Sequence, residues 1–196
     1  MKILATVAAF FTFLISLVSG VVFPSKNQSP ETTSPPQLET ASFYLSSDVS
    51  YPTVGDELPV SINLRADGVN IVAAAIRIVY KYIGILPILP IDADSLADGT
   101  QAQINESLSD SGWVFPVNEV IQDKNLSLIT IDLAAVNLRP EGFVSSEEVK
   151  LATLDMIVAS APPKITFHFD KTQTKLISKE GEEVKLQLKP GEFVLR

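Results

Sequence analysis

The sequence predicts an all-β protein built as an antiparallel β-sandwich. From Phe43 onward, apolar residues alternate with polar ones in short blocks, which is the pattern of strands with one buried face. Gly, Pro, Asp and Asn separate these blocks at intervals of roughly ten to fifteen residues. No long segment has the period of a helix that could cross between parallel strands, so we expect the strands to pair antiparallel.

An uncharged apolar stretch from Ile3 to Phe23 predicts one N-terminal hydrophobic helix before the sandwich. Its 21 residues match the roughly 20 that cross a bilayer, whereas Val18-Ser19-Gly20 offers the small residues at which a signal peptidase cuts. Residues 1–23 are therefore expected to be a signal peptide or a membrane anchor, and both remain open. Because Lys2 precedes the stretch, we expect the rest of the chain at the extracellular face of the membrane, anchored there or secreted.

Residues 24–40 read PSKNQSPETTSPPQLET, a stretch rich in Pro, Ser and Thr that predicts an extended linker. Residues 41–196 are then enough for one domain with its own core and too few for two. The linker is expected to hold this domain away from the membrane, as in a protein displayed on a surface.

The first clear strands are Leu58–Leu64 and Val72–Tyr80, with turn residues Asp67-Gly68 between them, and we expect the two to form a hairpin. In the second block, alternation separates Ala75, Arg77 and Val79 from the residues of the other face, so we expect Arg77 to see solvent. The residues expected on that other face are Ala74, Ile76, Ile78 and Tyr80.

The next block, Ile83–Ile91, contains Pro87 and Pro90, which cannot donate to a ladder and predict an edge or broken strand. Five further strands are expected after it. They are Trp113–Val120, Leu126–Ala134, Val149–Val158, Ile165–Phe169 and Lys185–Leu195.

Charge and cysteine content exclude several classes of function. The formal net charge is -8 with the acidic residues scattered along the chain, so nucleic acid is not an expected partner. The chain has no cysteine, which excludes disulfides, thiolate nucleophiles and cysteine-ligated zinc.

The sequence offers no catalytic arrangement, and we expect no enzyme. The single histidine, His168, is predicted on a strand facing away from Phe167 and Phe169, where a surface histidine is the simpler interpretation than a catalytic base. A Gly-x-Ser-x-Gly elbow, a phosphate-binding Gly-rich loop and a second histidine for zinc are all missing. The acidic pair Glu147 and Glu148 falls in a turn-like segment, as do the aspartates after Ile91, and solvated turn residues are expected there rather than a glycosidase pair.

Two binding chemistries stay open. Asp92, Asp94 and Asp98 could supply oxygen ligands to a structural calcium ion, although the EF-hand spacing is not met, and plain turn chemistry is the alternative. Trp113 is singled out as a ring on which a sugar could stack, with core packing as its alternative. The other aromatic candidates for stacking are Phe115, Tyr44, Tyr51 and Tyr82.

The order of the motifs resembles that of cohesin domains over nearly all of residues 43–196. The opening segments that carry the resemblance are Phe43-Tyr-Leu-Ser-Ser47, Tyr51-Pro-Thr-Val-Gly-Asp-Glu57 and Val60-Ser-Ile-Asn-Leu64. The segments that continue it are Val69–Tyr80, Pro140-Glu-Gly-Phe143, Val149–Met156, Ile165-Thr-Phe167 and Gly181.

This resemblance implies a jelly-roll sandwich, related to cellulose-binding modules of polysaccharide-degrading systems, that binds a dockerin-type protein or a polysaccharide without catalysis. It also implies that one sheet carries the partner-binding face, with strands that correspond here to Val72–Tyr80, Trp113–Val120, Leu126–Ala134 and Ile165–Phe169. Alternation along those strands gives the outward positions as Arg77, Thr130, Asp132, Thr166 and His168.

The leading hypothesis is therefore an exported cohesin-like binding module at the cell surface, linked to the binding or breakdown of extracellular polysaccharide. The alternative is a surface-layer or pilus-like structural subunit that self-associates through exposed edge strands. Apart from the calcium ion considered above, no cofactor is expected.

Overall fold

The computed structural model describes residues 40–82, 88–90, 101–160 and 162–196. The predicted N-terminal helix, almost all of the predicted linker, and Asp92, Asp94 and Asp98 lie outside the described residues. Within the described part, no helix has the length and apolar character required to cross a membrane.

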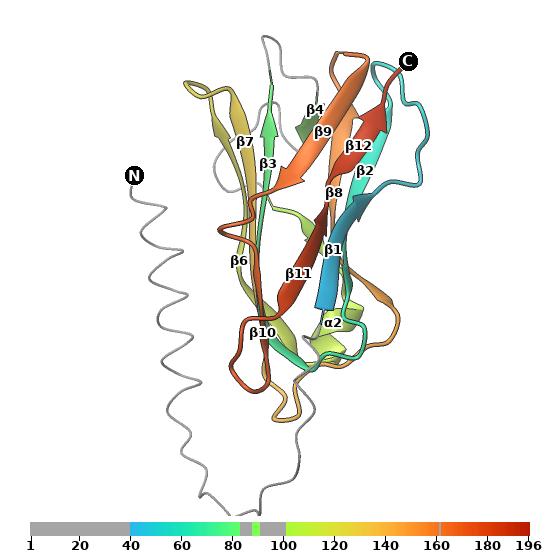
Figure 1. Cartoon of the computed structure of the whole chain (residues 1–196). Helices are drawn as coiled ribbons and strands as arrows, with labels where there is room; N and C mark the ends of the chain where they lie inside the picture. Colours follow the sequence, from blue (N-terminus) through green and yellow to red (C-terminus); the bar gives the residue numbers. More distant parts are fainter. Residues whose placement is uncertain (1–39, 83–87, 91–100, 161) are drawn as a thin grey trace, which may run out of the picture.

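The described residues form two six-stranded sheets that face one another (Figure 1). Sheet A has the strand order β11-β1-β2-β8-β4, with β5 also on β8, and its strands are β1 (Thr40–Ser46), β2 (Glu57–Arg65), β4 (Ile88–Pro90), β5 (Gln103–Ile104), β8 (Glu148–Val158) and β11 (Lys185–Lys189). Sheet B has the order β12-β9-β3-β7-β6, with β10 also on β3, and its strands are β3 (Ile71–Lys81), β6 (Trp113–Asp123), β7 (Leu128–Asn137), β9 (Lys164–Phe169), β10 (Lys175–Ser178) and β12 (Gly191–Val194). One short helix, α2 (Ser107–Asp110), precedes β6. The predicted all-β sandwich is confirmed.

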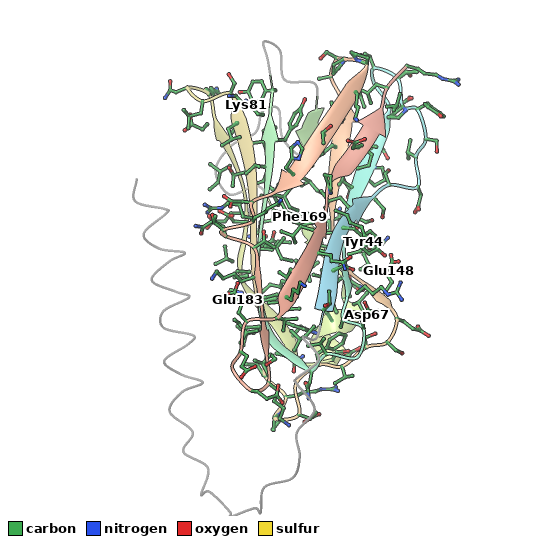
Figure 2. All side chains as sticks on the ribbon, in the orientation of Figure 1. Tyr44, Asp67, Lys81, Glu148, Phe169 and Glu183 are labelled. Carbon is green, nitrogen blue, oxygen red and sulfur yellow. The ribbon has the colours of Figure 1, made fainter. Side chains whose placement is uncertain are left out.

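The core lies between the sheets, where the alternation of the sequence predicted it. On β2, Leu58, Val60, Ile62 and Leu64 are all buried, and on β3 the predicted inner set from Ala74 to Tyr80 is buried as well. Phe43 of β1 stacks on Phe169 of β9 with ring centroids 6.1 Å apart, so one aromatic pair spans both sheets; Phe169 is labelled in Figure 2. Burial of such alternating apolar faces is the main term that holds a sandwich together.

The predicted hairpin between the first two blocks is wrong. Strand β2 pairs with β1 and β8 in sheet A, whereas β3 pairs with β7, β9 and β10 in sheet B. The turn at Asp67-Gly68 is present, with both residues at positive φ, but it sits in a connection from Ala66 to Asn70 that carries the chain from one sheet to the other. Turn residues alone do not show whether a connection joins two paired strands of one sheet, as in a hairpin, or two strands of different sheets.

The predicted strand Lys185–Leu195 divides at Pro190 into β11 of sheet A and β12 of sheet B. Gly191 follows the proline in a tight position, since a Cβ atom there would come within 2.8 Å of the Leu45 Cβ. Strand β11 also pairs parallel with β1, so this edge departs from the antiparallel pairing of the other strand pairs.

Segment 101–104 closes the opposite edge of the sandwich. Strand β5 pairs with β8 through Gln103 and Ile104, while the preceding Ala102 is held by the side chain of Asn118 on β6. The edge strands β6 and β5 are thereby joined although they belong to different sheets.

Candidate partner-binding face

The four strands that the sequence assigns to one binding face lie side by side in sheet B, in the order β9-β3-β7-β6. Residues opposite one another in the ladders share a face of a sheet. The register therefore groups Val79 with Thr130 and Ile121, and Arg77 with Asp132 and Glu119, on the outer side of the sheet. We call this outer side of β9, β3, β7 and β6 the sheet B face.

Arg77 and Asp132 form a buried ion pair in the middle of the sheet B face. Arg77 Nε donates to Asp132 Oδ1 at 2.6 Å, and Arg77 Nη2 donates to Asp132 Oδ2 at 2.7 Å. Only 9% of Arg77 and 4% of Asp132 is exposed, so the prediction that Arg77 sees solvent is wrong, although both residues lie on the outer side of the sheet. The physical reason is the position of the two residues, which lie directly opposite one another on the adjacent strands β3 and β7. Each side chain covers the other, and the strands on either side keep water away from both.

The turn after β9 fixes the backbone of Arg77. The Thr174 hydroxyl accepts from the Arg77 N–H and donates to the Arg77 carbonyl, both at 3.2 Å, and the Asp170 N–H donates to the same carbonyl at 2.8 Å. Hydrogen bonding to Asp132 raises the pKa of Arg77 despite its burial, with the charges of Asp132 and Asp170 adding to the effect. Arg77 is thus held as a cation in this site.

Asp170 is stabilised as an anion beside this pair. Partial burial acts to raise its pKa, but hydrogen bonds from Thr172 and Gln173 together with the charge of Arg77 outweigh burial, and the pKa of Asp170 lies below its ordinary value. The Asp170 carboxylate accepts from the Thr172 N–H at 2.9 Å and from the Thr172 hydroxyl at 2.7 Å. Hydrogen bonds between residues of the turn itself therefore hold its conformation.

Around the ion pair, the sheet B face is largely apolar. Ala75 and Ala134 are buried there without belonging to the core between the sheets, and the half-buried apolar residues are Val79, Val117, Ile121 and Val136. Polar groups surround this centre: Thr130 and Thr166 are half-buried, and His168 and Glu119 are exposed. The cavities lined by β11 and by β12 do not include residues of β3, β6 or β7.

No family model matches the sequence, and no curated protein matches it either. Among solved structures, a type II cohesin domain from the cellulosome of Acetivibrio cellulolyticus superposes with a TM-score of 0.57 over 79% of this chain and 95% of that domain, at 13% identity. The chain has the cohesin fold. The sequence resemblance to cohesins is confirmed at the level of fold.

Two further structures with the cohesin fold were solved with dockerins. One is a type II Cohesin-X-Dockerin complex from Acetivibrio cellulolyticus, with 12% identity, a TM-score of 0.57, and coverage of 80% of this chain and 99% of that one. The other, from the same organism, is a third cohesin in complex with a dockerin displaying a type I interaction. It has 10% identity, a TM-score of 0.53, and coverage of 79% and 98%.

In this cohesin fold, Trp113 does not offer a surface for sugar stacking. The residue is 3% exposed, and its ring packs edge-on against Phe143 with centroids 5.5 Å apart. It lies opposite Asn137 on the inner side of the sheet, where its buried Nε1 has no hydrogen-bond partner. Tyr82 is also buried, and its hydroxyl accepts from Gln122 Nε2 at 2.8 Å.

The remaining candidates do not assemble into a reactive centre. His168 is exposed on β9 between the buried Phe167 and Phe169, and Glu147 and Glu148 are exposed at the start of β8. Within the described part of the chain, no group of three or more His, Cys, Asp or Glu side chains comes close enough to hold a metal ion.

Sequence reasoning missed the pairing of Arg77 with Asp132, which are 55 positions apart. A signal was present, because Arg77 and Asp132 each interrupt an apolar block, and opposite charges that are buried in a sheet are expected to pair with one another.

Proposed function

We propose that this protein is an exported cohesin-like module that binds a dockerin-type protein through the sheet B face. The observation that carries the proposal is a sheet face whose centre is apolar and whose margin is polar, with the buried pair Arg77 and Asp132 at its middle. Protein interfaces have this composition, with an apolar centre depleted of free charge and a polar rim. The dockerin complexes formed by proteins of the same fold support this choice of partner.

The chemistry of the face favours a protein over a polysaccharide. Sugars bind flat protein faces by stacking on exposed aromatic rings. The outward ladder positions named above on β3, β7 and β6 carry valine, isoleucine, alanine, threonine, Glu119 and the ion pair, with no aromatic ring among them. An apolar, shallow surface of this kind suits the side of a helix or another rigid protein element.

The location proposed for this module is the extracellular face of a membrane. It rests on the apolar stretch Ile3–Phe23 and on Lys2 before it, as an anchor or as a signal peptide that is removed. We further propose that the module serves extracellular polysaccharide breakdown by holding a partner in place, without turnover of its own.

A binding experiment with the full-length chain tests the proposal. The chain is immobilised and titrated with purified type I and type II dockerin modules, and Ile121→Asp is compared with the wild type. A charge placed in the apolar centre of the interface is expected to weaken binding at least about tenfold, because it would have to lose its hydration.

Leu126→Asp is the matched control. Leu126 is 62% exposed in the turn between β6 and β7, outside the sheet B face, and this variant is expected to bind like the wild type. Failure of the wild type to bind any dockerin, or equal binding by Ile121→Asp, overturns the proposal. Concentration-dependent assembly in analytical ultracentrifugation without dockerin binding would instead support the self-associating subunit, and glycan binding blocked by Ile121→Asp would support a polysaccharide partner.

A further inference from the structure

A second surface feature lies away from the centre of the sheet B face, where the segment after β1 meets β12. A cavity of about 370 Å³ opens there between residues 45–52 and residues 192–194. Its apolar part includes Leu45 and Phe193, both buried, and its open side includes Tyr51. The volume is within the range of roughly 300 to 1,000 Å³ that is usual for sites that hold small ligands.

Tyr51 is held in an unusual conformation with its ring exposed. Its φ is 55°, in the left-handed region that non-glycine residues rarely adopt, and 55% of the residue is exposed. The Arg196 guanidinium lies 4.8 Å from the ring centroid, and the Arg196 N–H donates to the Pro52 carbonyl at 3.1 Å. Arg196 therefore holds the Tyr51 ring in place at the margin of the cavity.

Two serine hydroxyls of the cavity wall accept a hydrogen bond but do not donate one to any described residue. Ser46 Oγ accepts from Asn63 Nδ2 at 2.9 Å, and Ser47 Oγ accepts from the Val49 N–H at 3.2 Å. Neither hydroxyl donates to another group in the described part of the chain, so each can donate to a ligand. On the other wall, the Glu192 carboxylate is bound to Lys164 at 2.6 Å through Oε2, which leaves Oε1 as an acceptor.

We propose that this cavity, which we call the Tyr51 groove, binds a pyranose ring of a glycan. A pyranose presents C–H groups on its faces and hydroxyls around its rim, so it needs an aromatic platform together with both donors and acceptors. Tyr51 supplies the platform, Ser46 and Ser47 supply donors, and Glu192 supplies an acceptor. Among the aromatic residues considered for stacking, Tyr51 is the one that combines high exposure with a cavity.

This inference goes beyond dockerin binding and uses different residues. A module with both sites would hold a protein partner on the sheet B face and a glycan at the end of the sandwich. The simpler structural role of Tyr51, to tie Arg196 to the turn, predicts no glycan affinity, so binding decides between the two.

The test is isothermal titration calorimetry of the full-length chain with three probes: cellotetraose, xylotetraose and tetragalacturonate. Saturable binding of at least one probe is expected. Tyr51→Ala is expected to weaken it at least tenfold, while Tyr51→Phe, which keeps the ring, stays within about threefold of the wild type. Val54→Ala is the matched control, because Val54 is 56% exposed in the same turn but does not line the groove.

Two results would overturn the inference: no saturable binding of any of the three probes to the wild type, or wild-type affinity in Tyr51→Ala. Thermal unfolding of each variant shows whether it folds. If Tyr51→Ala does not, Tyr51→Gly replaces it, since glycine accepts positive φ without strain. Dockerin binding by the same variants is expected to remain unchanged, so failure of this inference and failure of the proposed function give different results.

Discussion

The side-chain amide of Asn118 forms hydrogen bonds with both backbone polar groups of Ala102. Asn118 Nδ2 donates to the Ala102 carbonyl at 2.7 Å, and Asn118 Oδ1 accepts from the Ala102 N–H at 2.9 Å. Asn118 belongs to sheet B, whereas Ala102 leads directly into β5 on the edge of sheet A. One amide thus takes the place of a neighbouring strand and joins the two sheets.

Replacing Asn118 is expected to loosen that edge. Asn118→Ala removes both bonds and leaves the Ala102 backbone groups without a partner, at an expected cost of about 1 to 3 kcal/mol in the free energy of unfolding. Urea unfolding followed by Trp113 fluorescence measures it. Asn125→Ala, in the exposed turn after β6, is the control and should stay within about 0.5 kcal/mol of the wild type. Equal stability of the two variants would show that the link between the sheets is not needed.

The Arg77 and Asp132 pair is expected to behave as a unit. Arg77→Met leaves a buried carboxylate unpaired and should cost about 3 to 5 kcal/mol, whereas the double variant Arg77→Met with Asp132→Leu should regain most of that loss. Chemical denaturation of the wild type, both single variants and the double variant completes a double-mutant cycle. Additive losses would mean that the two residues do not stabilise one another.

Gly142 and Gly68 both have positive φ but differ in the space around them. A Cβ atom at Gly142 would meet the Asn70 side chain and come within 3.1 Å of the Ile71 carbonyl, whereas a Cβ at Gly68 meets nothing within 4 Å. Gly68→Ala should therefore cost only the left-handed backbone penalty of about 1 to 2 kcal/mol, and Gly142→Ala should cost clearly more. Thermal unfolding of the two variants ranks them, and the opposite order would contradict this packing.

Asp170 should contribute to stability at neutral pH and not in acid. Its pKa in the folded chain lies below the ordinary value of 3.8, so the unfolded chain binds the proton more readily. The contribution is present above the unfolded pKa and is lost as the pH falls through the folded pKa. We expect Asp170→Asn to lose less stability than the wild type between pH 7 and pH 3, as measured by urea midpoints.

Asp48→Asn is the control for that experiment, because Asp48 is exposed and its side chain makes no hydrogen bond within the described part of the chain. It should show the same pH dependence as the wild type. If the stability of Asp170→Asn also shows the pH dependence of the wild type, the hydrogen bonds of the turn do not favour the ionised form of the Asp170 carboxylate.

The sequence predicted the faces of individual strands well, because alternation is a local property. The inner residues of β2 and β3 follow it without exception. It did not predict that Asp67-Gly68 leads to another sheet, or that Pro190 divides β11 from β12, because partners far along the chain decide which sheet a strand joins.

Trp113 shows where alternation itself fails. Trp113 and Val120 are both buried, although an odd spacing would put them on opposite sides of a regular strand. The register of β6 shifts between Val114 and Val117, and this irregularity brings both residues to the core. Alternation in the sequence gives no sign of this shift, so it does not reveal that Trp113 and Val120 both lie in the core.

The parallel pairing of β1 with β11 determines how the sandwich responds to tension. In Figure 1, β1 and β11 run side by side toward the end of the sandwich at which β12 ends, and the paired strands point the same way. A force that pulls the start of β1 and the end of β12 apart slides β1 along β11 instead of peeling it away. The hydrogen bonds of the ladder then share the force and must break together, so the sandwich is expected to resist extension along its own length better than a sheet opened from one end.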